Sequence, residues 1–326
     1  MRTIIGFCIF VFAYLSEFGL YSYASHTDKD QASTDQDFFT IGMLPDTQHM
    51  TTDGELDQKR ENLYGMFDFF KDRKSALNLK MVSHLGDMTN NNVKRDPCDK
   101  MLRQWERINS GFDIFRQHNV PFSVARGNHD HPELLKTFFS AKDYHNLPIS
   151  SVLGGTKGRK TMKNAYYLFS ASGIPMIIIV LDWNPKADEY EWAQSILNKY
   201  KDHYGILISH SFNPLTDALI EKNDNILFGI MGHETRDVHY TRRSSKNRIK
   251  HFFVFDYQNS LEHTYGAVVK YFTFIPEYSR IKIKMRTYSI ATQSDLSREE
   301  CWGKSKESAK KCQKLDFYVD RYSSAS

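Results

Sequence analysis

The 326-residue chain is poor in several features that would narrow its class. It has four cysteines, none of them in the spacing of a zinc-binding motif. Its net charge of +4 is too small, and its charges are too evenly spread, to indicate a protein that binds nucleic acid. It has no Asn-x-Ser/Thr sequon, which favours an exported bacterial protein over a eukaryotic glycoprotein. After the first 24 residues, no segment has the length and apolar character needed to cross a membrane.

Residues 1–24 have the pattern of a signal peptide. Arg2 precedes the apolar run Ile4–Leu15, which is short for a membrane span. Ser22-Tyr23-Ala24 then places small residues at the two positions that signal peptidase requires. We therefore expect a secreted or periplasmic protein whose mature chain begins near Ser25. An uncleaved anchor is the alternative, because apolar residues continue as far as Tyr21.

The two ends of the mature chain are polar. Residues 25–37 contain no Phe, Trp or Tyr and are predicted to be flexible. Residues 293–326 form a polar tail in which Cys301 and Cys312 can close a small disulfide loop, while Cys98 is left without an assigned partner. Between these ends, residues 38–292 are predicted to form one catalytic domain, since neither an internal repeat nor a linker is visible.

Strand-like and helix-like segments alternate in most of this domain. The predicted strands are 38–44, 79–85, 121–125, 166–169, 176–181, 205–209 and 226–231, and the predicted helices are 56–73, 99–118 and 189–200. This alternation indicates parallel strands in an α/β fold. The basic stretch 242–248 is interpreted as a solvated loop, and the alternative is that it binds an anionic substrate or surface. Three strands without intervening helices follow at 249–255, 267–275 and 281–288, so we expect two sheets flanked by helices.

Five of the predicted strands are followed by a residue that can bind a metal ion. These residues are Asp46, Asp87, Asn128, His210 and His233. Ligands bind at the carboxyl ends of strands in α/β sheets, so aligned strands would bring the five side chains together. Oxygen and imidazole donors without thiolate suit Mn, Fe, Zn or Mg. Two such ions about 3.5–4 Å apart can clamp a phosphoryl group and generate hydroxide at neutral pH.

Each motif alone also has an ordinary structural interpretation. Gly86-Asp87 can be a turn with a capping carboxylate. Gly127–Asp130 can be a turn before a helix that begins at Pro132. A single His210 after a strand is more often a hydrogen-bonded core residue than a ligand. The order, strand context and spacing of all five residues argue against coincidence.

Together the motifs resemble the calcineurin-like metallophosphoesterase superfamily. Its usual signature is Asp-x-His, Gly-Asp, Gly-Asn-His-Asp/Glu, a lone His and Gly-His-x-His. The matching residues here are Asp46, Gly86-Asp87, Gly127-Asn128-His129-Asp130, His210 and Gly232-His233. The likeness covers roughly residues 38 to 288 and implies a four-layer α/β/β/α sandwich of two mixed sheets flanked by helices. Asp46-Thr47-Gln48 resembles an exported subgroup with Gln in place of the first His, and 255–258 and 286–289 resemble that subgroup's later strands.

The resemblance also implies roles for individual residues. Asp87 would bridge two divalent ions. The remaining ligands would be Asn128, His210 and His233 at one ion and Asp46 and Gln48 at the other. His129 would contact the phosphate and help to protonate the leaving group, and Asp130 would orient His129. The implied reaction is in-line attack of a metal-bound hydroxide on a small-molecule or macromolecular phosphate ester, which can be a monoester or a diester.

Two positions depart from the usual signature, and both would serve the same ion. Gln48 stands where His is usual and can ligate weakly through its amide oxygen, whereas Thr235 replaces the last His and is a poor ligand. His49 and His239 are expected to be surface residues rather than replacements. We therefore expect one firmly held ion and one weakly held ion. The alternative function is a weak or inactive pseudoenzyme that binds metal and recognises a phosphorylated ligand.

The sequence is least informative about the substrate and the oligomeric state. Trp183 and Tyr257 are candidates to stack on a base or sugar, although core packing is the commoner use of such residues. No nucleic-acid scaffold is expected as a partner, and no membrane span is expected beyond the signal segment.

Overall fold

The computed structural model describes residues 37–54, 56–91, 93–158, 160–260, 266–296 and 314–321. The chain divides into two units, Met1–Thr34 and Asp35–Ser326, and all described residues belong to the second. The predicted signal peptide and the cysteines Cys301 and Cys312 lie outside the described residues. Cys98 is exposed and forms no disulfide within the described part of the chain.

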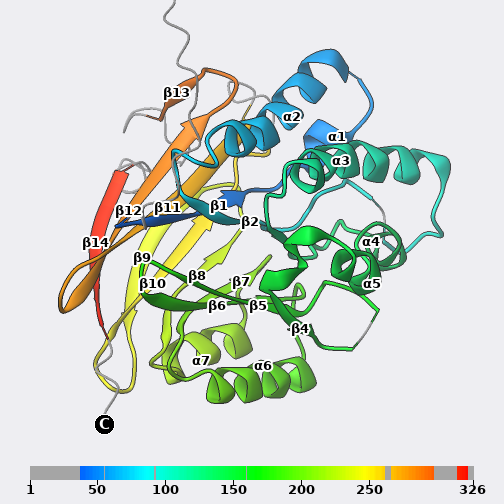
Figure 1. The fold of residues 1–326 in the computed structure, drawn as a ribbon. Helices are drawn as coiled ribbons and strands as arrows, with labels where there is room; N and C mark the ends of the chain where they lie inside the picture. Colours follow the sequence, from blue (N-terminus) through cyan, green and yellow to red (C-terminus); the bar gives the residue numbers. More distant parts are fainter. Residues whose placement is uncertain are drawn as a thin grey trace, which may run out of the picture. The chain divides into compact units, whose positions relative to one another are not determined.

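The first sheet contains both parallel and antiparallel strands. β1 (Phe39–Leu44), β2 (Leu79–His84) and β3 (Phe122–Val124) pair in parallel. The antiparallel part comprises β11 (Val268–Pro276), β12 (Arg280–Ser289), β13 (Ser294–Asp295) and β14 (Lys314–Asp320). The order is β13-β12-β11-β1-β2-β3, with β14 also paired to β12 (Figure 1).

The second sheet has the order β4-β5-β6-β7-β8-β10-β9. Its parallel strands are β6 (Ile174–Leu181), β7 (Tyr204–Ser209), β8 (Ile226–Met231) and β10 (Ile249–Phe255). Its antiparallel strands are β4 (Leu153–Thr156), β5 (Ala165–Ala171) and β9 (Asp237–Arg243). Both sheets are therefore mixed, as predicted.

Helices cover the outer faces of the two sheets. α2 (Leu56–Asp72) and α3 (Asp99–Gln117) lie on the first sheet, and α6 (Ala187–Lys199) and α7 (Pro214–Lys222) lie on the second (Figure 1). The shorter helices are α1 (Gln48–Thr51), α4 (Pro132–Phe138), α5 (Ala141–His145) and the 3-10 helix η1 (Pro148–Val152). None of the described helices is long and apolar enough to cross a membrane.

The side chains of the parallel strands explain the layered packing. Successive side chains of a strand point to opposite faces. In β6, Ile178 joins the core between the sheets, whereas Ile177 and Ile179 pack with residues of α6 and α7. The rings of Phe39 in β1 and Phe169 in β5 meet edge to face at 6.1 Å between the two sheets. The four-layer α/β/β/α sandwich is thus confirmed.

Two segments differ from the sequence-based expectation. The basic stretch 242–248 was expected to be a loop, but Arg242 and Arg243 belong to β9, and only the residues after them turn back towards β10. This hairpin returns the chain so that β10 runs parallel to β8. The expected tail 293–326 also contributes β13 and β14 to the first sheet.

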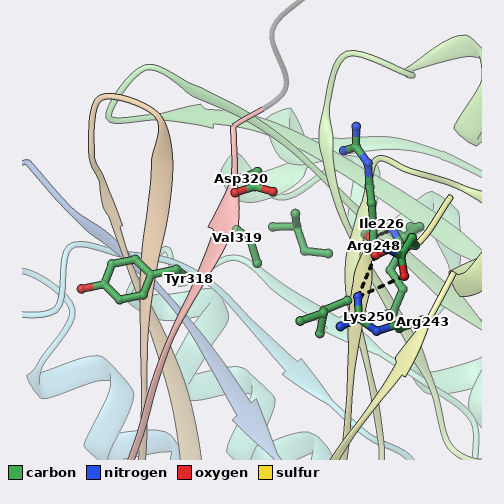
Figure 2. Close-up of a pocket in the computed structure, with 10 residues that line it drawn as sticks. Ile226, Arg243, Arg248, Lys250, Tyr318, Val319 and Asp320 are labelled. Carbon is green, nitrogen blue, oxygen red and sulfur yellow. Dashed lines mark hydrogen bonds between the residues drawn. The ribbon is translucent and has the colours of Figure 1, made fainter.

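Three basic residues of this hairpin, Arg243, Arg248 and Lys250, line a pocket of about 330 Å³ (Figure 2). It lies where β8 and β10 begin, whereas the candidate ligands follow the ends of strands. The ammonium of Lys250 donates to the carbonyls of Asn223, Asp224 and Ile226, so its charge already has partners within the fold. This basic cluster is thus separate from the predicted site.

Candidate metal centre

The predicted ligands come from the loops that follow parallel strands of both sheets. Asp46, Asp87 and Asn128 follow β1, β2 and β3 of the first sheet. His210 and His233 follow β7 and β8 of the second. The two groups meet, since the side chains of His210 and Asn128 are in contact, so the centre lies between the ends of the two sheets.

Four of the predicted ligands converge closely. His210 Nε2 lies 3.0 Å from Asn128 Oδ1, 3.3 Å from Asp87 Oδ2 and 3.1 Å from His233 Nδ1. Donor atoms bonded to an ion at about 2.1 Å are about 3.0 Å apart at a right angle and about 3.4 Å apart at the tetrahedral angle. The observed spacings fall in this interval, and Asp87, His210 and His233 form a group able to hold a metal ion.

The hydrogen bonds of His210 leave the correct nitrogen available. Its Nδ1 lies 3.0 Å from the carbonyl oxygen of Leu85, which can only accept. Nδ1 is therefore the protonated nitrogen, and the Nε2 lone pair points towards Asp87 and Asn128. The imidazole is fully buried, and this backbone contact fixes its plane.

The other half of the centre is rich in oxygen. Asp46 is fully buried and accepts from the backbone N–H of His233 at 3.3 Å through Oδ1 and 3.1 Å through Oδ2. Gln48 Nε2 lies 3.3 Å from Asp87 Oδ2 and also contacts Gln258 Oε1. Because Asp87 Oδ2 faces both His210 and Gln48, it lies where a bridging ligand would be required.

Sequence reasoning missed Asp256 and Gln258 as parts of the site. They follow β10, which is parallel to β8, so they reach the same edge of the second sheet as His233. Asp256 accepts from the backbone N–H and from Nε2 of Gln258, both at 2.7 Å. The signal that could have revealed them is an Asp directly after an apolar strand, the same pattern that identified Asp46 and Asp87.

The buried carboxylates favour a cationic occupant. Burial and the charges of Asp256 and Asp87 raise the pKa of Asp46 well above its usual range. Burial raises the pKa of Asp256 to about 7, and burial together with the charge of Asp87 raises the pKa of Asp130 to about 6. For Asp87 burial is again the largest single effect and acts in the same direction, but His210 and the backbone N–H of His129 together lower the pKa of Asp87. A bound cation would stabilise all these carboxylates in the charged form, so the donor set fits divalent metal ions.

Close backbone approaches hold the ligand loops together. A Cβ atom on Gly127 would lie 2.0 Å from Asp87 Oδ1, and one on Gly232 would lie 2.1 Å from Asp46 Oδ1. Two ligands also have left-handed backbone conformations, with φ of 47° at Asp87 and 67° at His233. Residues other than glycine adopt such angles at a cost, and they concentrate at functional sites.

His129 lies at the margin of the centre, as its predicted role requires. Its backbone N–H donates to Asp87 Oδ1 at 2.8 Å, and its side chain is partly exposed. It borders a pocket of about 500 Å³ together with Asn128 and Lys94. This pocket provides space for a substrate beside the ligands.

Asp130 has contacts other than the one predicted from the sequence. Its carboxylate accepts from the backbone N–H of Thr89 at 3.0 Å, from the Thr89 hydroxyl at 3.2 Å and from the backbone N–H of Gly127 at 2.9 Å. Asp130 therefore joins the loops after β2 and β3, and among the described residues its carboxylate makes no hydrogen bond to the imidazole of His129. The orienting role assigned to Asp130 remains a prediction.

Neither candidate replacement histidine occupies the position of a ligand. His239 Nε2 bonds with His251 Nδ1 at 2.9 Å and its ring stacks on Phe253, inside the second sheet. His49 is half-buried rather than at the surface, and burial together with the charge of Lys59 lowers the pKa of His49. Thr235 accepts from Asn259 Nδ2 at 3.2 Å, so it is turned to the neighbouring loop.

The two aromatic candidates differ in accessibility. Tyr257 is fully buried and donates its hydroxyl to Asp237 Oδ2 at 2.8 Å, which excludes stacking on a ligand. Trp183 is partly exposed, and its ring centroid lies 6.2 Å from that of His233. Only Trp183 therefore remains available as a stacking surface near the centre.

The family assignment follows from comparison with known proteins. The model of the calcineurin-like phosphoesterase family matches residues 39–237, which include five of the strand-end ligands. The chain belongs to the calcineurin-like phosphoesterase family. This family carries a metal-dependent phosphoesterase domain, in agreement with the donor set of the centre.

Individual relatives are distant. The chain is 23% identical over 269 residues to the uncharacterised protein YvnB of Bacillus subtilis strain 168; the match covers 73% of this chain but only 19% of YvnB. Among solved structures, GAP50, described as the anchor in the inner membrane complex of Plasmodium, has 11% identity and a TM-score of 0.47, covering 83% of this chain and 92% of that one. Vps29 of Cryptosporidium parvum has 8% identity and a TM-score of 0.37, covering 87% and 98%.

Proposed function

We propose that this protein hydrolyses a phosphate ester with the help of two divalent metal ions drawn from Mn, Fe, Zn and Mg. The observation that carries the proposal is the convergence of Asp87 Oδ2, Asn128 Oδ1 and His233 Nδ1 around His210 Nε2, at the spacing that a single ion imposes on its donors. The second ion would be held by Asp46, Gln48 and the shared Asp87.

The chain's own groups complete the chemistry. When bound, the ions would neutralise charge on the phosphoryl oxygens and lower the pKa of a coordinated water. His129 borders the adjoining pocket and can donate a proton to the departing alcohol oxygen. Lys94 borders the same pocket, where an ammonium favours an anionic ester. Asp130 holds the His129 loop against the loop after β2, which keeps the proton donor beside the ligands.

The pseudoenzyme alternative has less support. It was motivated by the replacement of two histidines, yet the oxygen-rich half of the centre is filled by buried polar groups rather than by apolar ones. Export of the protein is part of the same proposal and depends on the signal-peptide pattern of residues 1–24.

The test is hydrolysis of p-nitrophenyl phosphate and bis-p-nitrophenyl phosphate by the mature protein, without added metal and with added Mn²⁺, Fe²⁺, Zn²⁺ or Mg²⁺. We expect metal-dependent release of nitrophenol, and the preferred ester would distinguish a phosphatase from a phosphodiesterase. Asn128→Ala is the matched control and should lose this activity. Release that is equal in the Asn128→Ala protein, or no release with any of the four metals, would refute the proposal.

A further inference from the structure

The loop after β10 supplies an oxygen to the centre that the family signature does not include. Gln258 is 7% exposed, and its Oε1 contacts the side-chain amide of Gln48. Its backbone N–H and its Nε2 both donate to Asp256, each at 2.7 Å. These two bonds set the orientation of the Gln258 amide, so its oxygen rather than its nitrogen faces the centre.

Gln48, on the opposite side, has a buried oxygen without a partner. The residue is 4% exposed, and its Oε1 makes no hydrogen bond, while its Nε2 lies 3.3 Å from Asp87 Oδ2. A half-turn of the amide group exchanges these two atoms. Gln48 Oε1 would then face Gln258 Oε1 and Asp87 Oδ2 without a hydrogen atom between them.

Either orientation is unfavourable without a further group. In the first, a carbonyl oxygen is buried unsatisfied, which costs about 1–3 kcal/mol. In the second, three oxygens face one another, and a cation among them is the partner that satisfies all three. Asp46 adds a second, fully buried carboxylate. Its backbone lies beside the loop of Gln258, because a Cβ atom on Gly266 would be 3.0 Å from the carbonyl oxygen of Asp46 and 3.3 Å from the backbone nitrogen of Gln258.

We propose that Gln258 is a ligand of the second ion and that this ion is bound by oxygen donors alone. The donor set is Asp46, Gln48, Asp87 and Gln258. Gln258 takes the role of the last histidine of the family signature, which Thr235 replaces in this chain. Thr235 itself contacts Asn259, the residue next to Gln258. Asp256 is a positioning residue that fixes the amide of Gln258. The inference rests on the proposed function, since it assigns a ligand in the same two-metal centre.

The two halves of the centre consequently prefer different metals. The first site combines Asp87 and Asn128 with the imidazoles of His210 and His233, and imidazole suits Zn and Fe. The second site offers carboxylate and amide oxygens, which suit Mg and Mn. We expect the first ion to be retained during dialysis and the second to exchange with added Mn²⁺.

Metal content is the direct test because it does not depend on turnover. Purified protein would be stripped, loaded with Zn²⁺ and dialysed against Mn²⁺, with both metals counted by mass spectrometry and bound Mn²⁺ followed by electron paramagnetic resonance. Wild type should hold one Zn and one Mn per chain. Gln258→Leu should weaken Mn²⁺ binding about 10-fold or more and keep the Zn. Asn128→Ala should lose the Zn, and Gln58→Leu on the exposed face of α2 should behave as wild type.

The outcomes separate this inference from the proposed function. Equal Mn²⁺ affinity in wild type and a folded Gln258→Leu protein would overturn the assignment of Gln258, whatever the activity. A single ion per wild-type chain at saturating Mn²⁺ would overturn the second site even if the variant does not fold. Gln48→His, which restores the usual donor, should shift the second site from Mn towards Zn, and an unchanged preference would contradict its proximity to the ion. If Gln258→Leu selectively loses Mn but wild type hydrolyses neither ester, Gln258 would be confirmed as a ligand and the proposed enzymatic function would be refuted.

Discussion

Gly127 is the position at which a single methyl group should disrupt the centre most directly. A Cβ atom there would lie 2.0 Å from Asp87 Oδ1 and 2.2 Å from the Asp87 backbone nitrogen, where ordinary contacts are 3.4–4 Å. Gly127→Ala therefore has to move the loops after β2 and β3 apart by more than about 1 Å, and a misplacement of this size costs about 100-fold in rate. Since Asp87 Oδ2 faces both halves of the centre, we expect both ions to bind more weakly and kcat/KM to fall about 100-fold.

Two other glycines make this prediction specific. In Gly232→Ala the new Cβ would lie 2.1 Å from Asp46 Oδ1, so the oxygen-rich site should be weakened more than the site with the two imidazoles. Gly158 is exposed, a Cβ there has no neighbour within 4 Å, and its φ is 77°, so Gly158→Ala strains an exposed turn without touching a ligand and serves as the control for backbone strain alone. The assay is metal content per chain together with kcat/KM at saturating Mn²⁺. If Gly127→Ala keeps both ions and the wild-type kcat/KM, Asp87 is not the shared ligand.

Three further predictions concern proton transfer and stability. His129→Ala should lower kcat most for alkyl phosphate esters, whose leaving groups need a proton; an equal loss with p-nitrophenyl esters would contradict proton donation. Burial lowers the pKa of His251 from 6.5 to about 3. As the pH falls below 6.5, His251 is therefore protonated in the unfolded chain but not in the folded one. The contribution of neutral His251 to the free energy of unfolding is complete above pH 6.5 and is lost as the pH falls towards 3. Between pH 7 and pH 5 this loss is about 2 kcal/mol, and His251→Gln should be less acid-sensitive by that amount in urea unfolding; an unchanged pH dependence would disprove it. Tyr257→Phe removes the donor to buried Asp237 and should lower the free energy of unfolding by about 1–3 kcal/mol, whereas an unchanged urea midpoint would show that the bond is dispensable.

Most of the fold could be predicted because the local signals agree with the packing. The helix predicted at 99–118 is α3, whose buried residues Trp105, Ile108, Phe112 and Phe115 recur at helical spacing and face the core. The strands β1, β6, β7 and β8 are continuous apolar runs, as expected of strands buried on both faces. By contrast, β9 was missed because its exposed end carries Arg242 and Arg243, so the segment lacks the apolar signal of a strand.

Missing β9 had a consequence for the site. Without this hairpin, 249–255 appeared to begin a run of antiparallel strands, and the end of an antiparallel strand has no fixed relation to the ligand edge. The hairpin makes β10 parallel to β8, so Asp256 and Gln258 reach the centre. The five ligands found from the sequence all follow strands whose parallel direction was predicted correctly, which is why the strand-end rule located them.

The backbone strain of the centre has no signature in the residue types. Asp87 and His233 adopt left-handed backbone angles without being glycines, and one belongs to a loop of each sheet. Such angles cost of order 1–3 kcal/mol each, and they persist because neighbouring contacts determine them. At Asp87 the constraint is the adjoining Gly127, and at His233 it is the hydrogen bond from its N–H to Asp46. Each loop is thus held by a residue that follows another strand. The geometry of the centre therefore depends on both sheets together and cannot be read from any single stretch of sequence.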